Sequence, residues 1–100
     1  AVVIDRPRGS AHPRYPDAIY PLDYGYLDGT VSADGDGIDL FRGSAVGNGV
    51  VAVAVVADIV KKDVEVKILL ECTASEIDTA TAFLRDVLGL GATVLRRAVS

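Results

Sequence analysis

Residues 50–70 read Val-Val-Ala-Val-Ala-Val-Val-Ala-Asp-Ile-Val-Lys-Lys-Asp-Val-Glu-Val-Lys-Ile-Leu-Leu, and this stretch decides the fold. Residues 50–60 are β-branched at most positions, which predicts a long buried strand. Lys61-Lys62-Asp63 forms a polar turn, and in residues 64–70 apolar side chains alternate with Glu65 and Lys67. Two such runs joined by a short polar turn predict an antiparallel β-hairpin.

A single helix is predicted directly after this hairpin. Thr73-Ala74-Ser75-Glu76 has the spacing of a capping box, in which the threonine and glutamate side chains satisfy free N–H groups of the first turn. Gly89 or Gly91 is the expected helix end. The apolar residues after the cap recur at helical spacing, at Ile77, Ala80, Leu84, Val87 and Leu88.

Short strands are expected on both sides of these elements, at residues 1–4, in pieces of 19–27, at 38–41 and at 92–99. The segment after the first strand contains all four prolines and must therefore be irregular or extended. The predicted fold class is mostly β with one late α-helix, as a small OB-like antiparallel barrel of five to six strands. A length of 100 residues allows one domain, covering residues 1–100.

Composition excludes several classes of protein. With 50% hydrophobic residues, the chain is too apolar to be disordered. Its net charge of -4 argues against binding to nucleic acid or to an anionic membrane, because both require a basic face. Cys72 is the only cysteine, which excludes a disulfide within the chain and a thiolate metal cluster. The longest apolar stretch is shorter than a membrane span, so we expect a soluble cytoplasmic protein.

An aspartate-rich segment lies between Arg14 and Arg42. It holds six aspartates and no lysine or arginine, so its carboxylates repel one another unless a cation is bound. Its densest part, residues 34–39, reads Asp-Gly-Asp-Gly-Ile-Asp and can bring three carboxylates toward one point. The spacing does not fit a calcium EF-hand loop, whereas magnesium needs only one or two protein carboxylates. On spacing alone, a magnesium site and a solvated aspartate–glycine turn are both open.

Several linked motifs surround this segment. Residues 20–26 read Tyr-Pro-Leu-Asp-Tyr-Gly-Tyr, Gly29-Thr30 follows, and the aspartates of residues 34–39 come next. Upstream, residues 5–10 read Asp-Arg-Pro-Arg-Gly-Ser. In this order the motifs resemble the signature of the soluble family I inorganic pyrophosphatases. The resemblance covers most of residues 1–71.

The resemblance implies an OB-like barrel that hydrolyses pyrophosphate to two phosphates, or acts on a related phosphoanhydride. The implied cofactor is magnesium, with manganese as a substitute. The implied metal ligands are Asp34, Asp39 and Glu65, with Asp63 as a further candidate. Asp36 is implied to help activate the metal-bound water as the nucleophile. Two metal ions can clamp the attacking and leaving oxygens of such a reaction.

The resemblance also implies substrate-binding residues, namely Arg14, Tyr24 and Lys67, with Tyr20 shaping the site. Lys67 has a second interpretation from its own sequence context. Glu65 lies on the same face of the predicted strand, so Lys67 could instead be a solvated outer-face lysine paired with that glutamate.

Departures from the family pattern leave two classes of function open. Pro16 stands where the pattern has glutamate, and the segment between Arg14 and Tyr20 is too short for the usual phosphate-binding arginine. The first class is a magnesium-dependent pyrophosphatase with a reduced active site. The second is a non-catalytic barrel that acts as a metal-binding, phosphate-binding or assembly module. A single-strand nucleic-acid binder of the OB type is disfavoured by the net charge of -4.

Self-association is the last expectation from sequence. Residues 50–60 are apolar on both faces of the predicted strand, yet a small barrel has one interior and one helix cannot cover its outside. We therefore expect a closed homo-oligomer whose interface is rich in valine and leucine. The family resemblance points the same way, because bacterial pyrophosphatases assemble into symmetric oligomers, commonly hexamers.

Overall fold

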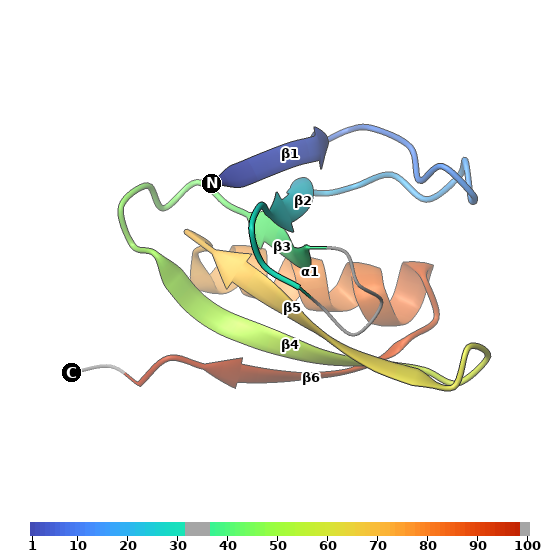
Figure 1. Cartoon of the computed structure of the whole chain (residues 1–100). Helices are drawn as coiled ribbons and strands as arrows, with labels where there is room; N and C mark the ends of the chain where they lie inside the picture. The colour runs from blue at the N-terminus through green and yellow to red at the C-terminus, as the bar shows by residue number, and fades with distance from the viewer. Residues whose placement is uncertain (32–36, 99–100) are drawn as a thin grey trace.

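In the computed structural model, which describes residues 1–31 and 37–98, the predicted hairpin is the longest part of the sheet (Figure 1). It consists of β4 (Val50–Asp58) and β5 (Asp63–Leu70), paired antiparallel up to Asp58 and Asp63 beside the turn. Lys62 has a φ of 56°, the left-handed conformation that closes a tight turn. The hairpin is therefore confirmed, but its first strand ends at Asp58 and not at Val60. Ile59 and Val60, expected in a buried strand, lie in the turn and are 85% and 93% exposed.

The helix begins at the predicted capping box. The Thr73 side-chain hydroxyl accepts the Glu76 backbone N–H at 3.2 Å, and the Glu76 carboxylate accepts the Thr73 backbone N–H at 2.9 Å. From this cap α1 (Ala74–Ala82) runs across one face of the sheet (Figure 1). No helix in residues 1–31 and 37–98 is long and apolar enough to cross a membrane.

The end of the helix departs from the regular α-helical geometry that the sequence predicts. After Ala82 the chain continues as a π-helical turn, η1 (Phe83–Val87), closed by the Leu88 N–H on the Phe83 carbonyl at 3.0 Å. Within this wider turn Phe83 and Leu84 are buried, whereas Val87, expected on the apolar face of the helix, is 53% exposed. Gly89, with a φ of +68°, follows the helix end as predicted.

The remaining strands are β1 (Val2–Arg6), β2 (Asp23–Leu27), β3 (Ile38–Arg42) and β6 (Gly91–Arg96). The sheet order is β1-β2-β3-β5-β4-β6. Neighbouring strands are antiparallel, except that β3 and β5 are parallel. The predicted fold class, mostly β with one late helix, is confirmed. The sheet remains open, and its mixed strand order is consistent with an OB-like fold.

The first two strands cross closely at a glycine. A Cβ atom at Gly25 would lie 1.8 Å from the backbone carbonyl oxygen of Val3, so only glycine fits there. β1 extends to Arg6, past the end expected from the sequence, and Arg6 pairs with Tyr24 of β2. This register brings Arg6 beside the Tyr24-Gly25-Tyr26 part of the sequence motif.

The core lies between the helix and the inner face of the sheet. Cys72 belongs to it with 4% of its surface exposed. An aromatic cluster fills the side of the core nearest the first loop, with ring centroids 4.9–5.0 Å apart between Tyr24 and Phe41 and between Tyr20 and both Tyr24 and Phe83. The aliphatic part comprises Ala52, Ala54, Val56, Leu69, Ile77, Ala80 and Leu84.

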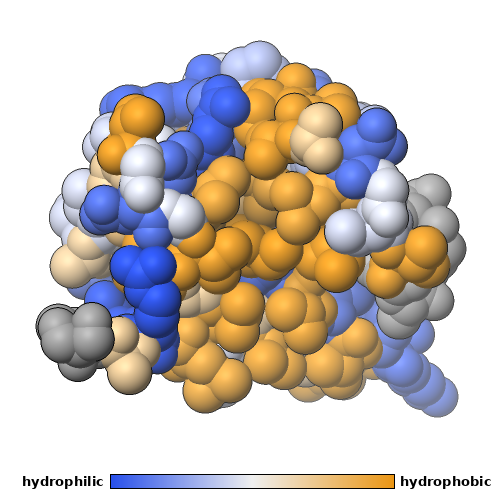
Figure 2. All heavy atoms as spheres, turned by 60° about the vertical axis from the view of Figure 1, so that its left-hand side comes forward, coloured by the Kyte–Doolittle hydropathy of each residue, from blue (hydrophilic) through white to orange (hydrophobic). Residues whose placement is uncertain are grey.

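The outer face of the sheet is also apolar. Side chains on a strand alternate between faces, so the neighbours of the buried positions point away from the helix. Across three paired strands these are Val53 and Val55 of β4, Val66 and Ile68 of β5, and Leu95 of β6. Figure 2 shows hydrophobic side chains gathered over much of one face of the molecule. We call these five residues the outer patch.

Candidate active site

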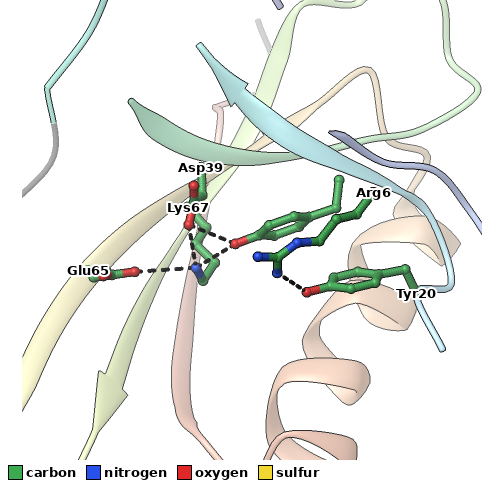
Figure 3. Close-up of polar contacts among 6 residues, drawn as sticks. Arg6, Tyr20, Asp39, Glu65 and Lys67 are labelled. Carbon is green, nitrogen blue, oxygen red and sulfur yellow. Dashed lines mark hydrogen bonds and ion pairs between the residues drawn. The ribbon is translucent and has the colours of Figure 1, made fainter. Parts of the chain in front are cut away.

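Lys67 is the one buried charged residue among the described residues, with 7% of its surface exposed. It lies on the inner face of β5, two positions from buried Leu69. Its Nζ donates to Tyr24 Oη at 2.8 Å, to Asp39 Oδ2 at 3.1 Å and to Glu65 Oε2 at 3.4 Å (Figure 3). The interpretation of Lys67 as a solvated outer-face lysine is therefore wrong, because the inner face holds it.

Three neighbouring strands supply these contacts. Tyr24 comes from β2, Asp39 from β3, and Glu65 with Lys67 from β5. The Tyr24 hydroxyl donates to Asp39 Oδ2 at 2.8 Å while it accepts from Lys67, so the phenol bridges the ammonium and the carboxylate. Every polar atom of this cluster that is buried has a hydrogen-bond partner in the described residues.

Electrostatics fix the charge of the cluster. Burial raises the pKa of Tyr24, so the phenol stays neutral at ordinary pH. Burial by itself would lower the pKa of Lys67, but Tyr24 and Asp39 beside it outweigh that effect and the pKa is raised. The site therefore holds a permanent ammonium, shared by two carboxylates, and a protonated phenol.

A second cation lies on the other side of Tyr24. Arg6 Nη1 donates to Tyr20 Oη at 2.6 Å, and its guanidinium carbon is 5.6 Å from the Tyr20 ring centroid and 5.5 Å from that of Tyr24. Lys67 Nζ is 5.4 Å from the same Tyr24 centroid. Figure 3 shows the Arg6 guanidinium directed at the Tyr20 hydroxyl. Arg6 is thus held by a hydrogen bond to Tyr20 and by contacts with both tyrosine rings, whereas Lys67 is held at the Tyr24 hydroxyl by its hydrogen bond.

These groups line a cavity of about 540 Å³. It opens where the loop after β1, the end of the helix and the β4–β5 turn lie at the same end of the molecule (Figure 1). Most of the residues implied by the family resemblance line it, namely Arg14, Tyr20, Tyr24, Asp39, Asp63, Glu65 and Lys67. Asp34 and Asp36 lie outside the described residues.

The cavity contains cations that the sequence analysis did not nominate. Arg6 and Lys61 line it together with Arg14, and no ion pair among the described residues involves any of the three. In the sequence, Arg6 is one of three arginines, with Arg8 and Arg14, that come just before the aspartate-rich segment, and this grouping was the available indication of a cationic site. Which arginine turns inward depended on where β1 ends, and the sequence did not determine that. Cations without acidic partners favour an anionic ligand.

The described carboxylates do not form a closed metal cage. Within residues 1–31 and 37–98 no group of three or more histidine, cysteine, aspartate or glutamate side chains could hold a metal ion. Asp39 and Glu65 converge on the Lys67 ammonium, and Asp63 lines the same cavity. Magnesium is usually held by one or two carboxylates with waters and phosphate oxygens, so these three residues are its candidate ligands among the described residues.

Comparison with known proteins adds structural neighbours. No protein-family model matches the sequence, and no curated protein matches it as a relative. The inorganic pyrophosphatase from Neisseria gonorrhoeae superposes with a TM-score of 0.61 at 20% identity, over 97% of this chain and 79% of that chain. The chain has the fold of inorganic pyrophosphatases.

Two further solved structures agree. The inorganic pyrophosphatase from Coxiella burnetii has a TM-score of 0.62 at 16% identity, over 95% of this chain and 82% of that chain. The inorganic pyrophosphatase from Helicobacter pylori has a TM-score of 0.60 at 17% identity, over 97% of this chain and 81% of that chain. The resemblance inferred from the motifs is thus confirmed as a shared fold.

His12 offers a direct probe of the cationic cavity, because it is the only histidine of the chain. Burial, followed by the charges of Arg6, Arg14 and Lys61, lowers its pKa. A phosphate bound among these cations would favour the imidazolium and raise that pKa. In an NMR titration we expect a midpoint below the ordinary value of about 6.5, and a higher midpoint when phosphate is added.

The lowered pKa also makes the folded state less stable as pH falls through the ordinary histidine range, because the unfolded chain takes up the proton first. Arg6→Gln should reduce the shift caused by phosphate, whereas Arg8→Gln, at an exposed position outside the cavity, should not. A His12 midpoint that phosphate leaves unchanged would contradict the anion site.

Proposed function

We propose that this chain hydrolyses pyrophosphate, or a related phosphoanhydride, in this cavity with magnesium as cofactor. One observation carries the proposal. The buried Lys67 ammonium, held by Tyr24, Asp39 and Glu65, lies in a cavity that Arg6, Arg14 and Lys61 also line, and none of these three forms an ion pair with another described residue. The pyrophosphatase fold of the neighbouring structures supports it.

Separate residues of the site would bind the substrate, orient the binding groups and accept the proton. Arg14 and Arg6 bind the phosphoryl oxygens, and Lys67 joins them by exchanging its longest hydrogen bond, to Glu65 at 3.4 Å, for a phosphoryl oxygen. These cations offset the charge that accumulates on the leaving phosphate. The neutral Tyr24 phenol orients Lys67 and Asp39 through the hydrogen bonds described above. Asp36 accepts a proton from the attacking water as general base.

The metal would be held by Asp34, Asp39 and Glu65, with Asp63 as a further ligand. When bound, magnesium lowers the pKa of a coordinated water and neutralises phosphate charge. The segment between Arg14 and Tyr20 is too short to include the usual phosphate-binding arginine, and Arg6 supplies part of the contact that this arginine would make. That substitution favours catalysis over the alternative of a non-catalytic binding or assembly module.

A phosphate-release assay tests this function. The protein should release phosphate from pyrophosphate with magnesium or manganese and should release none with chelator. Asp39→Asn should reduce the rate by at least about 100-fold, because it removes a carboxylate charge from the site at little change in shape. The matched control is Asp28→Asn, which alters an exposed aspartate outside the cavity and should leave the rate unchanged.

If the wild-type protein releases no phosphate above background with either metal, the hydrolase proposal fails. The binding-module alternative then predicts that magnesium and phosphate still raise the melting temperature, since each binds only the folded state.

We further propose that the outer patch binds a second copy of this chain, in a homo-oligomer. Val53, Val66 and Leu95 face away from the helix on adjacent strands, with Val66 47% and Leu95 58% exposed. A continuous apolar sheet face of this kind marks an interface more often than a free surface. Its valine and leucine content matches the interface expected from the sequence.

Light scattering behind a sizing column tests the assembly. The wild-type chain should elute as an oligomer, and Val66→Lys should shift it to the monomer because a charge in an apolar interface is costly. Val87→Lys changes an exposed valine on the helix and should not alter the mass. A wild-type monomer at high micromolar concentration would refute the proposal.

A further inference from the structure

One wall of the cavity is apolar, and pyrophosphate has no use for it. The β4–β5 turn contributes Ile59 and Val60, which line the cavity and are 85% and 93% exposed. Turns normally carry glycine, asparagine, aspartate or serine. Two large aliphatic side chains held in water at a turn add nothing to the core, so their place beside the cavity calls for a ligand.

The end of the helix continues this wall. Leu88 and Leu90 line the same cavity and are half-buried, on either side of Gly89. The positive φ of Gly89 turns the chain between them, so two leucines follow closely at one edge of the opening. Leu84 and Val56 lie deeper in the same lining. We call Ile59, Val60, Leu88 and Leu90 the apolar lip.

Polar groups line the cavity from several segments. Arg6, His12 and Arg14 belong to β1 and the loop after it, and Lys67 belongs to the middle of β5. The β4–β5 turn adds Asp58, Lys61 and Asp63, so Ile59 and Val60 are flanked by charged residues of the same turn. The cavity volume of about 540 Å³ falls in the range of sites for small organic molecules. A small, wholly polar anion would fill only the cationic part.

We propose that the ligand is an organic diphosphate, in which an apolar organic group is esterified to one end of a diphosphate. The diphosphate binds at Arg6, Arg14 and Lys67, and the organic group packs against the apolar lip. This inference rests on the proposed function, since it names the class of phosphoanhydride that the site would cleave.

Hydrolysis of such a compound balances without a further reactant. The water oxygen bonds to the terminal phosphorus, and the bond from that phosphorus to the bridging oxygen breaks. Its electron pair remains on the organic phosphate, and the two protons of water go to the phosphate products. The products are one organic monophosphate and one inorganic phosphate.

Calorimetric titration with a series of methyl, butyl and hexyl diphosphates tests the inference, with pyrophosphate as reference. Affinity should rise along the series, by up to about fourfold for each methylene that the lip buries. An Ile59→Ser, Val60→Ser double variant should lose most of the gain from methyl to hexyl. Val46→Ser alters another highly exposed valine, on a loop outside the cavity, and should keep the full gain.

The outcomes separate this inference from the proposed function. Tighter binding of longer chains without any phosphate release would sustain the ligand class and refute hydrolysis. Phosphate release from pyrophosphate with equal affinity for all chain lengths would sustain hydrolysis and refute the ligand class. A chain-length gain that persists in the double variant would also overturn the inference, as would a change of oligomer mass in that variant, because Ile59 and Val60 would then form a subunit contact.

Discussion

The arrangement of the site depends on a buried ammonium. Moving the Lys67 charge out of water costs several kcal/mol unless partners compensate it, and Tyr24, Asp39 and Glu65 supply that compensation. Because the partners come from β2, β3 and β5, the charge can be satisfied only when these three strands lie in the observed order. The same requirement keeps carboxylates and a cation together at one end of the sheet.

The aromatic cluster extends this constraint to the first loop. Tyr24 contacts Lys67 on one side and Arg6 on the other, and Tyr20 holds Arg6 through its hydroxyl. Tyr20 and Tyr24 also pack within the core, next to Phe83 and Phe41. The same two tyrosines therefore pack in the core and position the cations. A substitution that destabilises the core should thus also change the geometry of the cavity.

Local features of the fold could be predicted from sequence because neighbouring residues determine them. The hairpin of β4 and β5 and the capping box of Thr73 and Glu76 are examples, although the turn of the hairpin begins at Ile59 and not at Lys61. Val87 shows one limit, because it lies exposed in a π-helical turn and no short-range signal announces such a turn. Arg6 shows a second limit of prediction from sequence, because its place in the cavity depends on the length of β1 and on the pairing of β1 with β2. The parallel pairing of β3 with β5 likewise depends on contacts distant in sequence.

A double-mutant cycle between Lys67 and Asp39 tests the central claim, that this buried pair organises the site. Urea unfolding of Lys67→Met, Asp39→Asn and the double variant should give a coupling free energy of roughly 1–3 kcal/mol. The exposed pair Arg96 and Asp78, with 51% and 76% of the side chains exposed, should give no more than about 1 kcal/mol. A coupling near zero between Lys67 and Asp39 would contradict the account.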